Sequence, residues 1–121
     1  MKQPTPQVTF DDVDRIVRRD FVNDEYDAAM AILSEYGTEK WHRERERVQL
    51  AALNTANSDI QRLRSCIESA KLDYRDILIA AEFPMYGRVG WTRLRNLSPE
   101  EERSIIDGDW RQYDEWLKRP A

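Results

Sequence analysis

The sequence predicts a single all-α domain, a bundle of five or six helices arranged as helical hairpins without a sheet. Apolar residues recur every three or four positions along most of the chain, as they do on one face of a helix. N-cap residues followed by first-turn acids mark several helix starts. Four glycines and five prolines among 121 residues leave little turn chemistry for a β architecture. We expect residues 1–8 to be a flexible tail and residues 9–121 to form the domain.

Two helices are predicted near the N-terminus, over residues 9–19 and 23–36. Thr9 is expected to cap the first helix and Asn23 the second, because both are followed by acids that suit the positive end of a helix dipole. Gly37 comes where helices favour a left-handed glycine, so the second helix is expected to end at Tyr36.

A third helix is expected to start at Thr38 and to have two unlike halves. Residues 39–47 are almost wholly charged and should project into water, whereas residues 48–53 are apolar nearly all round and should be packed on several sides. The sequence Asn57-Ser58-Asp59 predicts a stop and a new start.

Two further helices follow, over about residues 59–71 and from Asp73, which is expected to act as an N-cap. Residues 77–81 are apolar all round and are predicted to lie at the centre of the fold. The helix should stop by Phe83, because Pro84 disfavours helical geometry in the residue before it.

Residues 84–97 are predicted to form a loop, and the last helix begins after it. Ser98 and Glu101 form a capping box, with Pro99 at the first helical position. Gly108 lies inside this helix and should weaken it. We expect residues 106–117 to supply an apolar stripe that includes Trp110.

The cysteine and histidine content excludes several kinds of site. Cys66 is the only cysteine and His42 the only histidine, so neither an internal disulfide nor a Cys/His zinc cage can form within this chain. Glu39 and Glu46 would share a helix face with His42, but an alternating-charge solvated surface explains that stretch better than a metal site does. Cys66 flanks an apolar stripe and is expected to be a small buried side chain. We predict no metal and no cofactor.

No segment resembles a secretion signal or a membrane span, and the net charge is −4. The negative charge argues against attraction of the whole surface to nucleic acid or anionic lipid. We therefore expect a cytoplasmic protein with no membrane partner.

One segment, the Arg/Trp loop 86–95, is the strongest candidate for a binding site. It carries Arg88, Trp91, Arg93 and Arg95 and no acidic residue. Arginine and tryptophan are common anchors of protein interfaces, and the same pair can bind phosphates and stack on bases. Three interpretations stay open: a loop pinned to the bundle for structural reasons, a protein-binding site, and nucleic-acid binding.

Two other tryptophans stand outside the expected apolar stripes. Trp41 lies in the charged stretch after Gly37, and Trp116 is offset by one position from the stripe of the last helix. Either side chain, where exposed, would mark a contact surface. We include both as secondary partner-binding candidates.

The sequence carries no catalytic motif: it has no phosphate-binding glycine loop, nucleophile elbow or metalloprotease helix. We therefore predict that the protein is not an enzyme. The function that fits best is a non-catalytic protein-interaction module with a protein partner or a homo-oligomeric state. Nucleic-acid binding through residues 86–95 is the alternative.

Three stretches resemble an uncharacterised family of small all-helical bacterial proteins of unknown function. They are Arg47–Leu53 followed by Asp59 and Leu63, then Asp73–Asp76 leading to Ala81–Pro84, and finally Ile105–Ile106 with Asp109–Tyr113 and Trp116–Leu117. The resemblance implies a compact all-α fold in the bacterial cytosol. It implies no activity and no catalytic residues.

Overall fold

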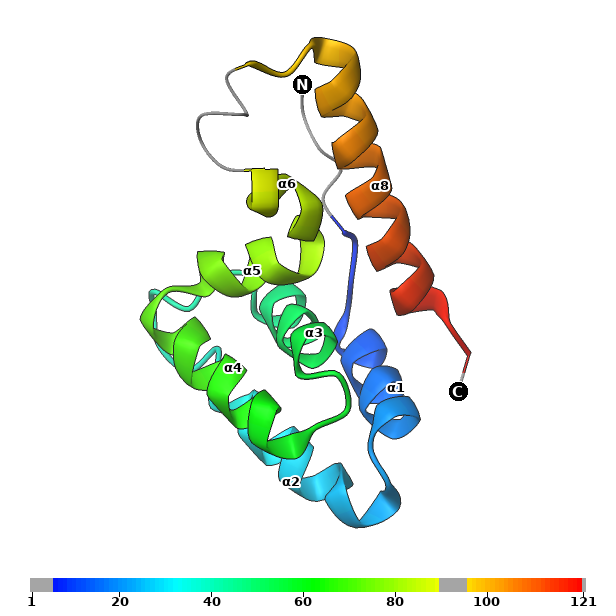
Figure 1. Cartoon of the computed structure of the whole chain (residues 1–121). Helices are drawn as coiled ribbons and strands as arrows, with labels where there is room; N and C mark the ends of the chain where they lie inside the picture. The colour runs from blue at the N-terminus through cyan, green and yellow to red at the C-terminus, as the bar shows by residue number, and fades with distance from the viewer. Residues whose placement is uncertain (1–5, 90–95, 121) are drawn as a thin grey trace.

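The computed structural model describes residues 6–89 and 96–120, and in these residues the chain forms seven helices and no strand (Figure 1). The all-α prediction is confirmed. The helices are α1 (Phe10–Asp20), α2 (Asn23–Ser34), α3 (Arg45–Ala56), α4 (Ile60–Leu72), α5 (Tyr74–Glu82), α6 (Pro84–Val89) and α8 (Pro99–Lys118).

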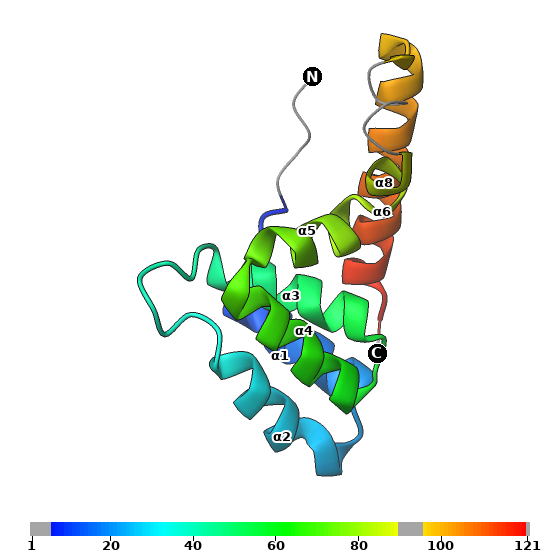
Figure 2. The same ribbon diagram turned by 60° about the vertical axis from the view of Figure 1, so that its left-hand side comes forward.

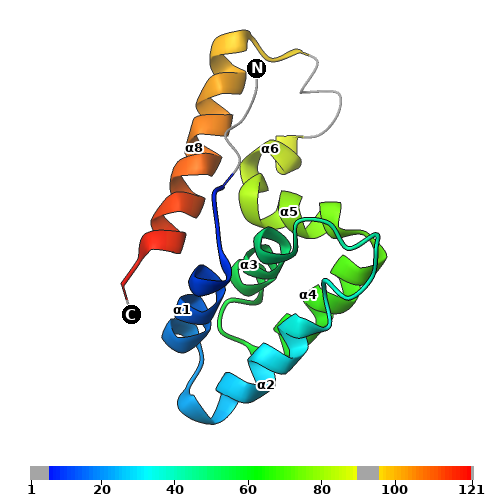
Figure 3. The same ribbon diagram turned by 180° about the vertical axis from the view of Figure 1, so that it is seen from behind.

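Helix α3 is the centre of the packing, with α1, α4 and α5 around it (Figures 1 and 3). Residues 48–53 of α3 are all buried, which confirms the prediction for this apolar run. Gln49 is the one polar side chain among them, and its amide donates hydrogen bonds to the carbonyls of Leu33 and Tyr36. The core therefore forms around α3, and backbone carbonyls at the end of α2 and just after it satisfy the buried side-chain amide of Gln49.

Side-chain caps begin three of the helices, and two of these caps, Asp73 and Ser98, are predicted by the sequence. The Asp59 carboxylate accepts hydrogen bonds at the start of α4, and that of Asp73 does so at the start of α5. Ser98 and Glu101 form the reciprocal capping box of α8. The prediction for α2 is wrong by one residue, since Val22 is the N-cap and Asn23 is already helical.

The packing of α5 corrects the prediction that this helix is buried all round. Residues 77–81 are not buried on all sides: Ile77, Leu78 and Ala81 face the core, whereas Ile79 is 47% exposed and Ala80 is also exposed. One face of α5 thus remains open to solvent, although its apolar composition predicts full burial.

The predicted loop over residues 84–97 is helical in its first part, because α6 begins at Pro84. The fully buried Asp109 of α8 explains this helix: its carboxylate accepts hydrogen bonds from the backbone amides of Met85 and Tyr86, both at 3.0 Å. A carboxylate at this position satisfies amides that an isolated first turn leaves unpaired. Asp109 therefore both starts α6 and fixes it to α8.

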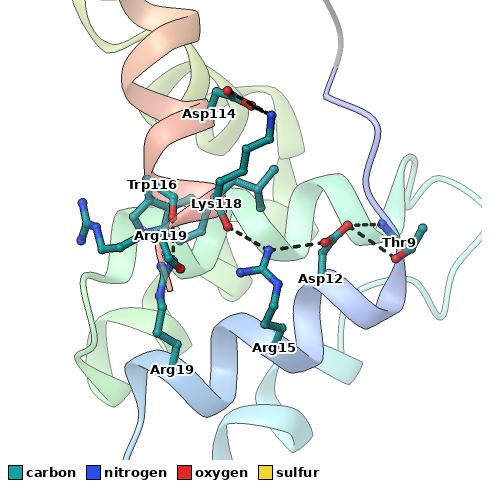
Figure 4. Close-up of polar contacts among 9 residues, drawn as sticks. Thr9, Asp12, Arg15, Arg19, Asp114, Trp116, Lys118 and Arg119 are labelled. Carbon is teal, nitrogen blue, oxygen red and sulfur yellow. Dashed lines mark hydrogen bonds and ion pairs between the residues drawn. The ribbon is translucent and has the colours of Figure 1, made fainter. Parts of the chain in front are cut away.

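The C-terminal end of α8 is held by two arginines of α1, and we call this set of contacts the arginine latch (Figure 4). Arg19 donates hydrogen bonds to the carbonyls of Trp116 and Arg119, at 2.6 and 2.9 Å. Arg15 donates to the carbonyl of Leu117 at 2.8 Å. The last carbonyls of a helix have no partners within it, so the guanidinium groups satisfy them and match the negative end of the helix dipole.

The segment before α1 contributes to the packed part of the chain. Of the residues expected to form a flexible tail, 1–5 lie outside the described part of the structure. Pro6 is buried, and Val8 packs against the core.

Replacing Gly108 by alanine is expected to stabilise the protein by about 1 kcal/mol, because glycine is a poor helix former. Helix α8 runs through Gly108 without interruption, and a Cβ atom there would meet no other atom within 4 Å. Urea unfolding of the variant and the parent protein measures the difference.

The matched control for this prediction is Gly37→Ala, which should destabilise the protein. Gly37 has φ of +106°, and an added Cβ would clash with Cδ of Arg45. If both variants changed the free energy of unfolding in the same direction, the conformational argument would be contradicted.

Candidate functional site

Residues 35–44 connect α2 to α3, and we call them the Trp41 loop. Figure 2 shows this loop projecting from the side of the molecule. The prediction of a helix from Thr38 is wrong, since α3 begins only at Arg45 and Glu44 before it has a left-handed φ of 49°.

His42 organises the interior of the Trp41 loop. Its Nδ1 atom accepts hydrogen bonds from the backbone amides of Gly37, at 2.9 Å, and Glu39, at 3.3 Å. The imidazole stacks on the ring of Tyr36 with 4.5 Å between ring centroids. The Tyr36 hydroxyl in turn donates a hydrogen bond to the carbonyl of Arg43 at 2.8 Å. These contacts explain why the segment folds back on itself instead of continuing as a helix.

The hydrogen bonds at His42 fix its protonation state. An imidazole nitrogen that accepts hydrogen bonds carries no proton, so the neutral ring bears its proton on Nε2. The adjoining Tyr36 is buried, and that burial raises its pKa to about 12, so its hydroxyl remains a donor to Arg43 at neutral pH.

The hypothesis that Glu39, His42 and Glu46 share one helix face does not hold, because residues 39–42 are not helical. Nδ1 of His42 is also committed to backbone amides. Among the described residues, no group of three or more metal-binding side chains is close enough to hold an ion.

A pocket of about 460 Å³ lies beside the loop, lined by residues of the loop and by Lys71 of α4. The loop residues that line it are Glu35, Thr38, Glu39, Trp41 and His42. The Lys71 ammonium lies 3.0 Å from Glu35 and 2.9 Å from Glu68. Its hydrogen bond holds the pKa of the Glu35 carboxyl below its usual value. The pocket therefore combines both signs of charge with one aromatic wall.

Trp41 is the most conspicuous apolar side chain of this site. It is 63% exposed, and its indole meets the His42 ring edge-on with centroids 5.7 Å apart. Since His42 is itself fixed by the backbone, Trp41 is presented from an ordered base. A large aromatic side chain exposed in this way is typical of contact surfaces.

Trp116 has a different environment from Trp41. It is partly buried and stacks on Tyr113 at 5.3 Å, while the Arg19 guanidinium lies 5.2 Å from its ring centre. Its carbonyl belongs to the arginine latch (Figure 4). The structure thus uses Trp116 in packing α8 against α1.

The Arg/Trp loop is only partly within the described residues. Arg88 is exposed in the last turn of α6, whereas Trp91, Arg93 and Arg95 lie outside the described part of the chain. Figures 1 and 2 place α6 and the Trp41 loop at opposite ends of α5. Arg88 therefore belongs to α6, a different element from the loop that carries Trp41.

Cys66 is buried, as the sequence predicts, and burial raises the pKa of its thiol. The sequence does not predict the roles of Asp109, of His42 or of Glu82, whose carboxylate pairs with Arg47 at 2.6 Å. Each role depends on a partner that is distant in sequence or is a backbone group. The only signal for His42 is the aromatic residue Tyr36 six positions before it.

Comparisons of the chain with protein-family models, with curated proteins and with solved structures find no match. Among the described helices, none is long and apolar enough to cross a membrane.

Proposed function

We propose that the protein is a non-catalytic protein-binding domain whose principal contact surface is centred on Trp41. The observation that carries the proposal is a 63% exposed indole held on a loop that His42 orders. A rigid aromatic group loses little conformational entropy on binding, so its burial contributes to affinity with a small opposing cost.

The composition of the surrounding pocket supports a protein partner. Trp41 supplies apolar area, while Glu35, Glu39 and Lys71 provide charged groups around it. An apolar centre with a polar rim is the usual anatomy of a protein interface. The partner can be a different protein or a second copy of this chain.

Binding of nucleic acid through residues 86–95 is a weaker proposal. It depends on Trp91, Arg93 and Arg95, which lie outside the described residues, and of the binding candidates in this segment the structure describes only Arg88. Membership of the uncharacterised family of small bacterial proteins, and a place in the cytosol, also remain proposals that rest on sequence resemblance and composition.

Trp41→Ala is expected to weaken partner binding about 30-fold or more, which corresponds to about 2 kcal/mol for an interface hot spot. The wild-type protein, immobilised, is used to capture a partner from the native lysate, and the affinity of that purified partner is then measured for each variant. Sedimentation of the free protein shows whether the partner is a second copy.

Val22→Ala is the matched control, because Val22 is an apolar side chain with nearly the same exposure, 64%, on another part of the surface. It should bind as the wild-type protein does. Equal binding by Trp41→Ala and wild type would sink the assignment of the surface. Capture of nucleic acid that is released steeply by salt would favour the alternative instead.

A further inference from the structure

The Trp41 loop is closed only around an unprotonated His42. Nδ1 accepts hydrogen bonds from the backbone amides of Gly37 and Glu39. In the described part of the chain these two amides have no other acceptor. Each end of the loop also has a left-handed residue, Gly37 with φ 106° and Glu44 with φ 49°. The loop conformation therefore depends on the His42 hydrogen bonds and on the ring stack with Tyr36.

Protonation of His42 reverses the role of Nδ1. The imidazolium carries a proton on both nitrogens and accepts no hydrogen bond. An N–H group at Nδ1 would face two N–H donors at 2.9 and 3.3 Å, so both amides would lose their acceptor and the like-signed hydrogens would repel. The positively charged ring is thus incompatible with this closed loop.

The charged groups around His42 offer the imidazolium another position. Glu35 at the end of α2 and Glu39 within the loop line the same pocket as the ring. Lys71 and Arg64 of α4 oppose a second positive charge there, but both are already paired with Glu35, and Lys71 is also paired with Glu68. On the α3 side, Arg45 lies against Gly37 and is paired with Glu46.

The balance of these groups favours outward movement of a charged ring. Carboxylates attract the imidazolium, whereas its present position at the backbone amides repels it. Glu39 is exposed, lies three residues before His42 and lines the same pocket as the ring, so its carboxylate is available to the imidazolium.

We propose that protonation of His42 opens the Trp41 loop and so changes how Trp41 is presented to a partner. The loop opening follows from the hydrogen bonds of the free protein, whereas its effect on binding rests on the proposed function.

The test follows individual amides of the free, full-length chain by NMR between about pH 7.5 and pH 5.5, the range in which histidines titrate. The hydrogen-exchange protection factors of the Gly37 and Glu39 amides are expected to fall about tenfold or more as the His42 ring becomes charged, because each loses its acceptor. The His42 ring proton signals report its protonation, and the Trp41 indole signal reports the change in edge contact.

His42→Asn is the matched control, because the asparagine side-chain oxygen can take the place of Nδ1 as an acceptor but does not titrate. Its Gly37 and Glu39 amides should keep the same protection across the pH range. An equal fall in this variant would assign the effect to the carboxylates and overturn the proposal. Unchanged protection in the wild-type protein while its His42 ring becomes charged would overturn it without any variant.

The outcomes separate this switch from the proposed function. If the wild-type amides respond as expected and Trp41→Ala still binds every partner normally, the switch stands and the binding surface fails. If the amides do not respond and Trp41→Ala loses binding, the surface stands and the switch fails.

Discussion

Glu82→Ala is expected to destabilise the protein by about 3–5 kcal/mol, because it leaves a largely buried guanidinium without its main partner. The Glu82 carboxylate accepts hydrogen bonds from Nε and Nη2 of Arg47, at 2.9 and 2.6 Å. The Glu82 side chain is only 4% exposed and that of Arg47 is 17% exposed. The hydrogen bond to Glu82 raises the pKa of Arg47. A guanidinium is charged at neutral pH even without a partner, so Arg47 stays charged when Glu82 is removed.

Glu44→Ala is the matched control for Glu82→Ala. Glu44 contacts the same guanidinium at 2.7 Å, but its side chain is 46% exposed. Its loss should cost no more than about 0.5 kcal/mol, as for other exposed ion pairs. Guanidinium chloride is unsuitable for this measurement because its salt screens charges, so urea unfolding is preferred.

A double variant separates the ion pair from the packing around it. Replacing Arg47 by methionine together with Glu82 by leucine should recover most of the stability lost in Glu82→Ala, because apolar groups of similar volume avoid the cost of a buried charge. A loss below about 1 kcal/mol in Glu82→Ala would contradict the structural role assigned to the pair.

Asp109→Ala is the second variant with a large expected effect, a loss of about 2–4 kcal/mol. The substitution removes a fully buried carboxylate that accepts hydrogen bonds from the amides of Met85 and Tyr86, and leaves both donors unpaired. Since these amides begin α6, this helix should lose hydrogen-exchange protection to a greater extent than α3 does.

Asp107→Ala serves as the control for this effect, because Asp107 is an exposed acid on the same helix. Its free energy of unfolding should stay within about 0.5 kcal/mol of the parent value. If the two variants lost similar stability, the effect would come from charge on α8 and not from the cap of α6.

The parts of the fold that could be predicted from the sequence are those that depend on neighbouring residues. Ser98 and Glu101 are three positions apart and form their capping box wherever that helix lies. Asp73 likewise caps α5 through the amide of Arg75, two residues away. The apolar run of α3 is buried because no arrangement of this chain could leave it in water at low cost.

The parts that could not be predicted depend on partners distant in sequence or on backbone groups. Residues 84–89 have the proline and glycine of a loop, yet Asp109 supplies the acceptors that make them helical from 24 residues away. Residues 38–44 have the charge spacing of a helix, yet the amides of Gly37 and Glu39 donate hydrogen bonds to the His42 side chain. In a helix such amides would donate to backbone carbonyls instead. Local propensity is overridden in both segments by a single side chain.

The candidate site, like the fold, could be predicted from the sequence only in part. Trp41 is noticeable in the sequence because an indole stands among charged residues, and the structure places it in solvent. The only sequence signal for its support by His42 is the aromatic residue Tyr36, six positions before the histidine. Trp116 is just as unusual in its sequence context, but its ring stacks on Tyr113, three residues earlier on the same helix. It also lies against Arg19, which no spacing rule connects to it.

The arginine latch has a consequence for the order in which the chain is completed. Arg15 and Arg19 bind carbonyls that lie 97 to 102 residues further along the sequence. During synthesis from the N-terminus, α1 therefore exists long before the groups it will bind, and its guanidinium groups stay hydrated until then. Helices α1 to α5 are synthesised in that interval, so the arginine latch can close only after the chain that forms them is complete.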